Sequence, residues 1–381
     1  MDFVSIIKHS KWIYEIYHFS VSFIIKLLKA FVKTDEHLIL FVSFGGRYFN
    51  DNPKVLYNAM LNDERYKGYK LVWAFLNPDL VDIKTPKIKI NSFKYIFTAL
   101  KARCWVTNTS MERGLNFTGK NTFYLHTTHT FLPKLMGYDC EKKAFSHTVY
   151  NFDCSCAQSE KEKRLQMSAY GMHDNQILIS GYPKNDILCN YSVERYLELR
   201  RKLNLPNDKK VILYAPTYRD LNFAAMKCPV DFKKWESVLG HDFIVLFRAH
   251  PVVANATLID SSSGFIFDVS GYPDNVDLMI ASDILISDYS GIFFEYAVQK
   301  KPMFCYAYDY NDYIKDRNLY FDIRKVLPGG MMSEDKLLKT IKTGGFSEFE
   351  SLWDKFRDDY VSEYGRATVL CLNKIIEAIQ K

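Results

Sequence analysis

Short apolar runs alternate with amphipathic stretches along most of this chain. The first series of runs comprises residues 38–44, 69–75, 104–107 and 122–126. Runs of this length are typical of strands buried on both faces of a parallel sheet. A helix predicted around residues 53–62 supplies one of the crossovers that parallel neighbours require. The pattern predicts a Rossmann-like domain over residues 35–186, closed by the turn-rich segment 181–186.

A second series of apolar runs follows the same pattern. It comprises residues 210–215, 243–248, 265–268, 284–286 and 302–306. We predict a second Rossmann-like domain over residues 187–345 and C-terminal helices over residues 346–381. The fold class is therefore α/β, with two parallel sheets facing a cleft. Ligands in open α/β sheets bind beyond the carboxyl ends of the strands, so residues that directly follow strands are the site candidates.

The N-terminal segment, residues 1–34, has a different pattern. Lysines recur among Trp, Tyr, Phe and Ile, and no uncharged run reaches the roughly 18–20 residues that a membrane span needs. A small-residue cleavage site is missing, which argues against a signal peptide. Basic and aromatic residues interleaved in this way predict amphipathic helices lying in an anionic membrane surface. The alternative is a helical hairpin packed on the protein's own core.

Composition narrows the function classes. A chain of 381 residues exceeds one ordinary core, which agrees with two domains. The net charge of +6 is mild and not clustered, so no nucleic-acid partner is predicted. The 8 cysteines are scattered without the paired spacing of zinc sites, and we expect reduced, buried thiols. We predict neither a metal nor a cofactor.

The segment from Asp283 to Ala297 carries the strongest local signal. An apolar strand ends at a polar turn containing Asp288, and Ser290 and Gly291 stand where the next helix begins. Backbone N–H groups at a helix start form a ready anion site. Glu295 follows one turn later, within reach of a ribose hydroxyl. The pattern predicts a nucleotide diphosphate at this end of the sheet.

Basic and polar residues follow two further strands of the second half. Arg248 and His250 follow one strand, and Thr217 and Arg219 follow another. An Arg fork and a protonated His suit a phosphate group, so these residues predict a diphosphate-holding cluster. The alternative for each residue alone is surface salt bridging.

Two histidines stand at the end of the last strand of the first series, with His126 as its final residue and His129 three residues later. Imidazole suits general base catalysis near neutral pH because its pKa lies nearby. The alternative is a hydrogen-bonded structural histidine. No matching carboxylate or HExxH pattern favours a metal half-site.

Several motifs together resemble the CDP-glycerol glycerophosphotransferase family of teichoic acid synthesis. Their order and spacing are specific from about residue 36 to residue 370, although each motif alone is weak. The motifs are FGGR at 44–47, Asn52-Pro53, LVW at 71–73, GYPKND at 181–186, YAPTYRD at 214–220, RAHP at 248–251, SDYS at 287–290, FEYA at 294–297 and YFD at 320–322.

The resemblance implies a GT-B-like fold and a phosphotransfer reaction. The implied donor is CDP-glycerol, or CDP-ribitol as in some members. The implied acceptor is a lipid-linked saccharide or polyol-phosphate chain at the cytoplasmic membrane face, so the protein is expected there as a peripheral membrane protein. An acceptor hydroxyl attacks the phosphorus that bears the polyol, and CMP leaves.

The family's first catalytic His lies in a His-Gly-Thr-Pro-Leu-Lys pattern, which maps onto His129 and Lys134. The loop departs from this pattern, with Thr130 in place of Gly, so His126 stays a rival. The second His maps onto His250. Ser290 and Gly291 map onto the phosphate turn, and Glu295 maps onto the ribose-contacting acid, where the family more often has Asp.

Other readings stay open from the sequence alone. They are a GT-B transferase that uses a nucleotide sugar, and a membrane-docked scaffold that retains a nucleotide fold without catalysis. The presence of His and Arg after the strands argues against the scaffold. The short chain slightly favours a primase or short-extension role over a polymerase, and a homo-oligomer stays open.

Overall fold

The computed structural model describes residues 11–112, 114–115, 117–140, 149–217, 219, 230–249 and 260–381. The chain divides into two compact units. The first unit contains residues up to 129, 136–184 and 366–381, and the second contains residues 130–135 and 185–365.

A seven-stranded sheet forms the core of the first unit, in the order β3-β2-β1-β4-β5-β6-β7. All its recorded pairings are parallel. The central strand β1 is buried from Leu38 onward, as its unbroken apolar run predicts. The strands are β1 (Asp35–Val42), β2 (Lys70–Phe75), β3 (Lys87–Lys89), β4 (Ala102–Thr107), β5 (Phe123–His126), β6 (Cys154–Ala157) and β7 (Ile177–Ile179).

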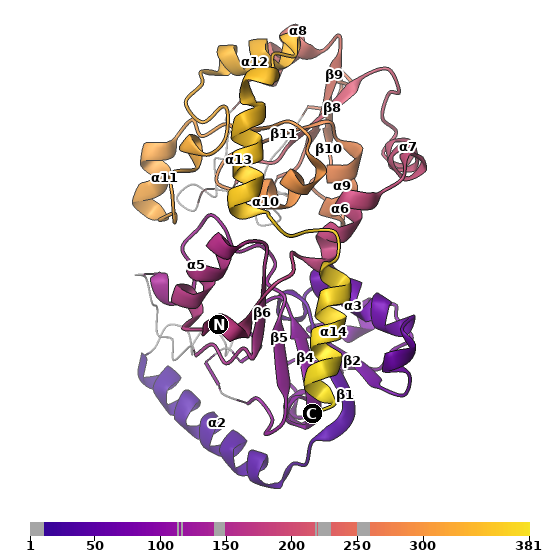
Figure 1. Cartoon of the computed structure of the whole chain (residues 1–381), viewed down its shortest axis with the longest axis vertical. Helices are drawn as coiled ribbons and strands as arrows, with labels where there is room; N and C mark the ends of the chain where they lie inside the picture. The colour runs from indigo at the N-terminus through magenta and orange to yellow at the C-terminus, as the bar shows by residue number, and fades with distance from the viewer. Residues whose placement is uncertain are drawn as a thin grey trace. The chain divides into compact units, whose positions relative to one another are not determined.

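The helices of the first unit come from both ends of the chain. They are α2 (Lys11–Phe31), α3 (Asp51–Leu61), α4 (Phe93–Lys101), α5 (Glu160–Tyr170) and α14 (Ala367–Ile379). The C-terminal helix α14 returns to pack beside α3 and the sheet (Figure 1), and Cys371, Leu372 and Ile375 join the same core cluster as Leu56. Arg103 of β4 donates to the last carbonyls of α14, at Ala378 and Ile379.

Helix α2 presents two apolar faces. One face packs on the first unit, where Ile25 is buried and His18 Nε2 lies 2.6 Å from the carbonyl oxygen of Gly114. The other face recurs every three or four residues and is between 49% and 83% exposed, at Trp12, Ile16, Phe19, Phe23, Leu27 and Phe31. Among the helices of the described ranges, none is long and apolar enough to cross a membrane.

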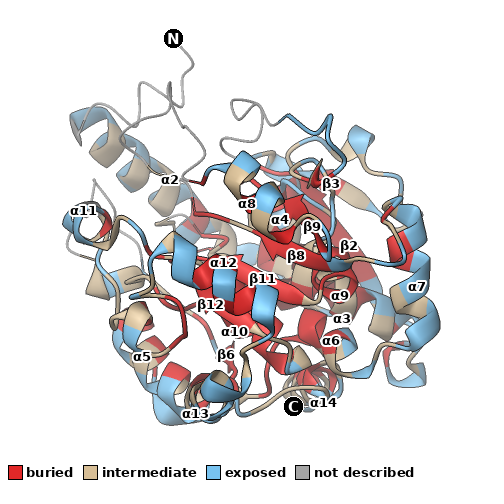
Figure 2. Ribbon diagram, turned by 90° about the horizontal axis from the view of Figure 1, so that it is seen from above, coloured by how far each residue is buried: buried red, intermediate tan, exposed pale blue. Residues whose placement is uncertain are grey.

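A five-stranded parallel sheet forms the core of the second unit, in the order β10-β9-β8-β11-β12. Its strands are β8 (Lys210–Tyr214), β9 (Phe243–Phe247), β10 (Ile266–Asp268), β11 (Ile284–Ser287) and β12 (Met303–Cys305). Its helices are α6 (Asp186–Asn190), α7 (Val193–Lys202), α8 (Phe232–Leu239), α9 (Asn275–Ala281), α10 (Ile292–Tyr296), α11 (Tyr310–Asp316), α12 (Glu334–Thr343) and α13 (Glu350–Tyr360). The strands β9, β11 and β12 are buried, as is β8 after Lys210, whereas α7 and α13 expose their outer faces (Figure 2).

The structure confirms the predicted α/β class with two parallel sheets. Every predicted strand is present, and β3, β6 and β7 are additional strands of three or four residues. The seven cysteines in the described ranges are free thiols, five of them buried, while Cys140 and Cys189 are half-buried.

Candidate active site

Both sheets reverse their strand order at one point, between β1 and β4 in the first unit and between β8 and β11 in the second. Crossovers leave such a point in opposite directions, which is why ligands of open α/β sheets bind beside the carboxyl ends of those two strands. The polar residues predicted from the sequence follow these strands or their neighbours.

The structure separates the two rival histidines by burial. His126 ends β5 and is 3% exposed, with its ring stacked 4.1 Å from that of Phe152. Its Nδ1 lies 3.2 Å from Ser155 Oγ. Burial, with a smaller effect from His129, lowers the pKa of His126 to about 3. His126 is therefore a neutral core residue at neutral pH.

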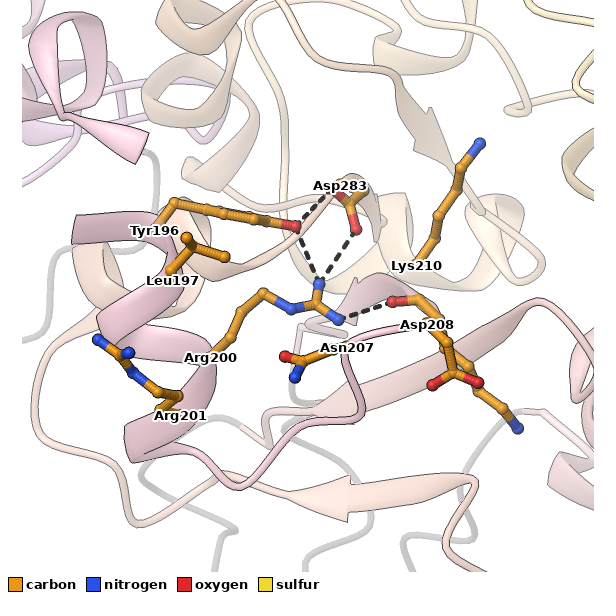
Figure 3. Close-up of a pocket in the computed structure, with 9 residues that line it drawn as sticks. Tyr196, Leu197, Arg200, Arg201, Asn207, Asp208, Lys210 and Asp283 are labelled. Atoms are coloured by element: carbon orange, nitrogen blue, oxygen red, sulfur yellow. Dashed lines mark hydrogen bonds and ion pairs between the residues drawn. The ribbon is translucent and has the colours of Figure 1, made fainter. Parts of the chain in front are cut away.

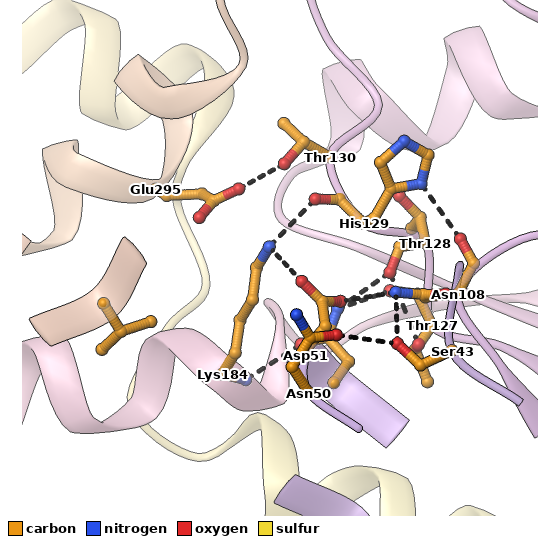
Figure 4. A network of polar contacts seen from close by, with 12 residues as sticks. Ser43, Asn50, Asp51, Asn108, Thr127, Thr128, His129, Thr130, Lys184 and Glu295 are labelled. Atoms are coloured by element: carbon orange, nitrogen blue, oxygen red, sulfur yellow. Dashed lines mark hydrogen bonds and ion pairs between the residues drawn. The ribbon is translucent and has the colours of Figure 1, made fainter. Parts of the chain in front are cut away.

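His129 is half-buried and oriented by the main chain. Its Nδ1 lies 3.0 Å from the carbonyl oxygen of Asn108, just after β4 (Figure 4). A carbonyl can only accept, so Nδ1 carries a proton, and in the neutral ring the lone pair then lies on Nε2. The ring of Phe44 packs against the imidazole with 5.3 Å between centroids. This tautomer is the one that a general base needs.

Four polar residues that the sequence left without a role surround this loop: Asp51, Asn52, Asn108 and Lys184. Asn52 and Lys184 belong to the motifs Asn52-Pro53 and GYPKND, whereas Asn108 and Asp51 belong to no motif. The position of Asn108, the first polar residue after a buried strand, was the available signal.

In the second unit, Asp288 joins the ends of β8 and β11. Its buried carboxylate accepts the backbone N–H of Thr217 at 2.8 Å and Arg219 Nη2 at 2.9 Å. Arg219 Nε also donates to Asp309 at 2.7 Å. Burial alone would lower the pKa of Arg219, but the Asp288 and Asp309 carboxylates raise it above its ordinary value. Two carboxylates thus compensate the Arg219 charge.

Arg248 follows β9 and is partly committed to the main chain. Its Nη1 donates to the carbonyl oxygens of Tyr272 at 2.8 Å and Val269 at 3.3 Å. Burial lowers the pKa of Arg248, with Asp274 opposing that effect. These bonds hold the guanidinium at the carboxyl end of the sheet. The predicted partner His250, together with Pro251, Tyr218 and Asp220, lies outside the described residues.

The turn after β11 is closely packed. Ser290 Oγ accepts the N–H of Ile292 at 3.3 Å, and Gly291 precedes α10. A Cβ on Gly291 would lie 2.1 Å from Thr130 Cγ2, so glycine lets residues 130–135 approach. The helix α10 has only five residues, which limits its dipole, so an anion at this turn would be held mainly by backbone N–H groups.

Glu295 and residues 319–320 contact the segment 130–135, which contains Lys134. Glu295 is 5% exposed and accepts a hydrogen bond from Thr130 Oγ1. A hydroxyl donor therefore already faces the carboxylate that the sequence assigned to a ribose. Lys134 pairs with Leu319 through an antiparallel bridge, and the ring of Phe131 stacks on Tyr320 at 5.5 Å.

A pocket of about 430 Å³ lies elsewhere in the second unit, beside the amino ends of β8 and β11 (Figure 3). Arg200 fills part of it, donating to Tyr196 Oη at 2.9 Å and the Lys209 carbonyl at 2.7 Å. Its position at the amino ends of the strands excludes it from the candidate site. It is lined by Tyr196, Leu197, Arg200, Arg201, Asn207, Asp208, Lys209, Lys210 and Asp283.

The family model of CDP-glycerol:poly(glycerophosphate) glycerophosphotransferases matches residues 24–370. The teichoic acid poly(glycerol phosphate) polymerase of Staphylococcus epidermidis is 33% identical over 347 residues, which cover 84% of this chain and 48% of that protein. The teichoic acid glycerol-phosphate transferase of Staphylococcus aureus is 31% identical over 331 residues, covering 80% and 82% of the two chains. The chain thus spans about half the length of the S. epidermidis polymerase.

Solved structures give the same relationship. A structure of the wall teichoic acid polymerase TagF is 30% identical, covers 93% of both chains and has a TM-score of 0.83. A TagF variant soaked with CDPG is 29% identical, covers 98% of both chains and has a TM-score of 0.82. This likeness confirms the fold class predicted from the sequence.

Proposed function

This chain belongs to the CDP-glycerol:poly(glycerophosphate) glycerophosphotransferase family, and we propose that it transfers glycerol phosphate from CDP-glycerol to a hydroxyl of a lipid-linked acceptor. The relatives are teichoic acid enzymes, and a TagF structure was soaked with CDPG. The observation that carries the proposal is the hydrogen bond from His129 Nδ1 to the Asn108 carbonyl, which places the basic lone pair of the neutral ring on Nε2.

The reaction exchanges one phosphorus–oxygen bond for another. His129 Nε2 takes the proton of the acceptor hydroxyl as its oxygen bonds to the phosphorus of glycerol phosphate. The bond from that phosphorus to the bridging oxygen breaks, and CMP leaves with that oxygen. Phosphoryl transfer depends chiefly on positioning and charge stabilisation. The oriented imidazole of His129 supplies the positioning for the acceptor hydroxyl.

The second unit would hold the donor at the carboxyl ends of its strands. The backbone N–H groups at Ser290 and Gly291 and the guanidinium of Arg248 would bind the diphosphate, with His250 as a further donor. Glu295 would exchange the Thr130 hydroxyl for a ribose hydroxyl of CDP-glycerol. The sequence also assigned Lys134 to substrate binding, and that role stays a proposal.

The structure changes the role that we propose for Arg219, Asp288 and Thr217. Because Arg219 is compensated by Asp288 and Asp309, it adds no net positive charge to the site. We assign this group to shaping the turn after β8, where the Thr217 N–H is held by Asp288. The phosphate would then meet backbone groups of that turn rather than the guanidinium.

Helix α2 would dock the protein on the cytoplasmic face of the membrane. One face of the helix packs on the first unit. The other face exposes six large apolar side chains. Exposed apolar faces of this size mark interaction surfaces, and the neighbouring Lys26 and Lys33 suit anionic headgroups. Docking would raise the local concentration of a lipid-linked acceptor.

The test is product analysis with a panel of donors. The protein is incubated with a lipid-linked saccharide acceptor analogue and CDP-glycerol, CDP-ribitol or a UDP-sugar, and the products are identified by mass spectrometry. We expect acceptor extended by glycerol phosphate, with CMP released, from CDP-glycerol. Extension only from CDP-ribitol or only from a nucleotide sugar would reject the proposed donor, and no extension from any donor would favour the non-catalytic scaffold.

A further inference from the structure

The start of α3 lies beside His129, yet the proposed reaction gives it no role. Its first residue, Asp51, has a φ of 62°, in the left-handed region that residues with a side chain rarely adopt. Such backbone conformations persist where the surrounding contacts hold them in place. The contacts of Asp51 and its neighbour Asn52 hold this conformation in place.

Asp51 contacts Asn108 and Lys184, which both form hydrogen bonds with His129. Its Oδ1 accepts Asn108 Nδ2 at 3.0 Å, and its Oδ2 accepts Lys184 Nζ at 2.8 Å. Asn108 holds the His129 ring through its carbonyl oxygen, and Lys184 Nζ donates to the carbonyl oxygen of His129 at 2.9 Å. One carboxylate thus fixes both the ring and the main chain of His129 (Figure 4).

Asn52 fixes the residues that lead into His129. Its side chain is fully buried, and Nδ2 donates to the carbonyl oxygens of Thr127 at 3.1 Å and Thr128 at 2.9 Å. Its Oδ1 accepts the backbone N–H of Lys184 at 2.9 Å. The start of α3 therefore ties the loop after β5 to the turn that carries Lys184. All these contacts lie within the first unit.

The charges of Asp51 and Lys184 are buried as a pair. Their side chains are 8% and 10% exposed, so water screens them little. Together the two charges form a neutral pair. Each charge alone would act on the imidazole, in opposite directions. In the described part of the first unit, the buried, neutral His126 also interacts electrostatically with His129, and Arg47 donates at 3.0 Å to the carbonyl of Phe44, whose ring packs against the imidazole.

We propose that Asp51 and Lys184 are positioning residues for the His129 base, an inference that rests on the proposed function. Asp51 acts through Asn108 and Lys184 to set the direction of the imidazole. The positive charge of Lys184 compensates the negative charge of the buried Asp51 carboxylate. Outer-shell contacts of this kind commonly decide how well a catalytic histidine is aligned. Neither residue is expected to touch CDP-glycerol.

The experiment compares Asp51→Asn, Lys184→Met and the double variant with the unchanged protein. We expect kcat to fall about 10- to 100-fold in each, because a misaligned base loses its near-attack geometry. The affinity for CDP-glycerol, measured by calorimetry, should stay unchanged. Rate against pH is then measured, because the acidic limb reports deprotonation of His129.

The two single variants should move that limb in opposite directions. Lys184→Met leaves Asp51 uncompensated, favours the imidazolium and moves the limb to higher pH, by roughly 0.5–1 unit. Asp51→Asn leaves Lys184 uncompensated and moves the limb to lower pH by a similar amount, roughly 0.5–1 unit. The double variant removes both charges, so its limb should return to the original pH while kcat stays low.

A matched control pair lies at the opposite end of the same sheet. Lys70 Nζ bonds Asp35 at 3.0 Å where β2 and β1 begin, so Lys70→Met and Asp35→Asn should change neither kcat nor the limb. Unchanged kcat in all three test variants, or limbs that move in the same direction in both single variants, would overturn the proposal. If a single variant fails to fold, the double variant decides, because it leaves no uncompensated charge. Retained turnover in His129→Ala would instead remove His129 as the base, and a lack of glycerol phosphate transfer by the unchanged protein would reject the proposed function itself.

Discussion

Replacing Gly291 by alanine adds one methyl group at the tightest contact of the candidate nucleotide turn. The φ of −64° and ψ of −14° suit any residue, so alanine introduces no backbone strain there. The new Cβ would lie 2.1 Å from Thr130 Cγ2, 2.9 Å from Thr130 Cβ and 3.0 Å from the Leu132 carbonyl oxygen. Unstrained carbon contacts lie at about 3.5–4.0 Å, so one of the two segments must move.

We expect Gly291→Ala to lower the free energy of unfolding by about 1–3 kcal/mol, as overpacking does. The same displacement should weaken CDP-glycerol binding, because it moves the N–H groups at residues 290–292. Thr130→Gly removes two of the three close contacts, and glycine adopts the Thr130 φ of 155° freely. In the Thr130→Gly background, Gly291→Ala should therefore lower the free energy of unfolding by less than about half as much as it does in the unchanged protein.

The assay is a double-mutant cycle, with urea unfolding for stability and calorimetry for CDP-glycerol. Gly271→Ala is the control, because a Cβ at Gly271 would meet nothing within 4 Å. That change should stay within about 0.5 kcal/mol of the unchanged protein. Additive effects of the two replacements, with a coupling below about 0.5 kcal/mol, would refute the packing of residues 130–135 against the turn.

Three further predictions follow from other parts of the structure. Burial raises the pKa of Glu162 from 4.5 to about 7, so its stabilising contribution is complete below pH 4.5 and is lost as the pH rises through 7. The free energy of unfolding should therefore fall by about 3 kcal/mol over that range. In Glu162→Gln this fall should be absent, which a comparison of urea midpoints at pH 5 and 8 measures. The same pH dependence of stability in Glu162→Gln and the unchanged protein would contradict this. Phe19→Ala with Phe23→Ala should leave stability unchanged but lower binding to anionic vesicles roughly 30- to 700-fold, at about 1–2 kcal/mol for each ring. Leu80→Ala, equally exposed off α2, should bind normally, and cosedimentation that finds equal binding by all three proteins would reject membrane docking through α2. Arg248→Ala should weaken CDP-glycerol binding by about 1.5–3 kcal/mol, and an unchanged Kd in calorimetry would remove Arg248 from the diphosphate site.

The sequence predicted the sheets because their strands are long apolar runs buried on both faces. It missed β6, Cys154–Ala157, because a strand built of Cys, Ser and Ala has no large apolar side chain to mark it. Its small residues are fully buried, and Cys156 Sγ packs 3.4 Å from Cys371 Sγ of α14, a contact 215 residues apart in sequence.

The candidate site was predictable in position but not in its connections. Polar residues that follow strands gather at the carboxyl ends of the sheets in both units, as parallel pairing requires. Spacing could not distinguish His126 from His129, because burial depends on Phe152 and on the neighbouring strand β6. Arg219 was expected to face a phosphate, but its partner Asp309 follows β12, and no local pattern announces that ion pair.

The central claim is that His129 removes the proton of the acceptor, and one comparison tests it most directly. Turnover of CDP-glycerol with a lipid-linked acceptor analogue is measured for His129→Ala and for the unchanged protein, alongside the Kd of CDP-glycerol. A lost general base should lower kcat by about 10²- to 10⁴-fold, while the donor binds as before. Normal turnover in His129→Ala would contradict the account, and normal turnover there with an inactive His126→Ala would assign the base to the buried histidine instead.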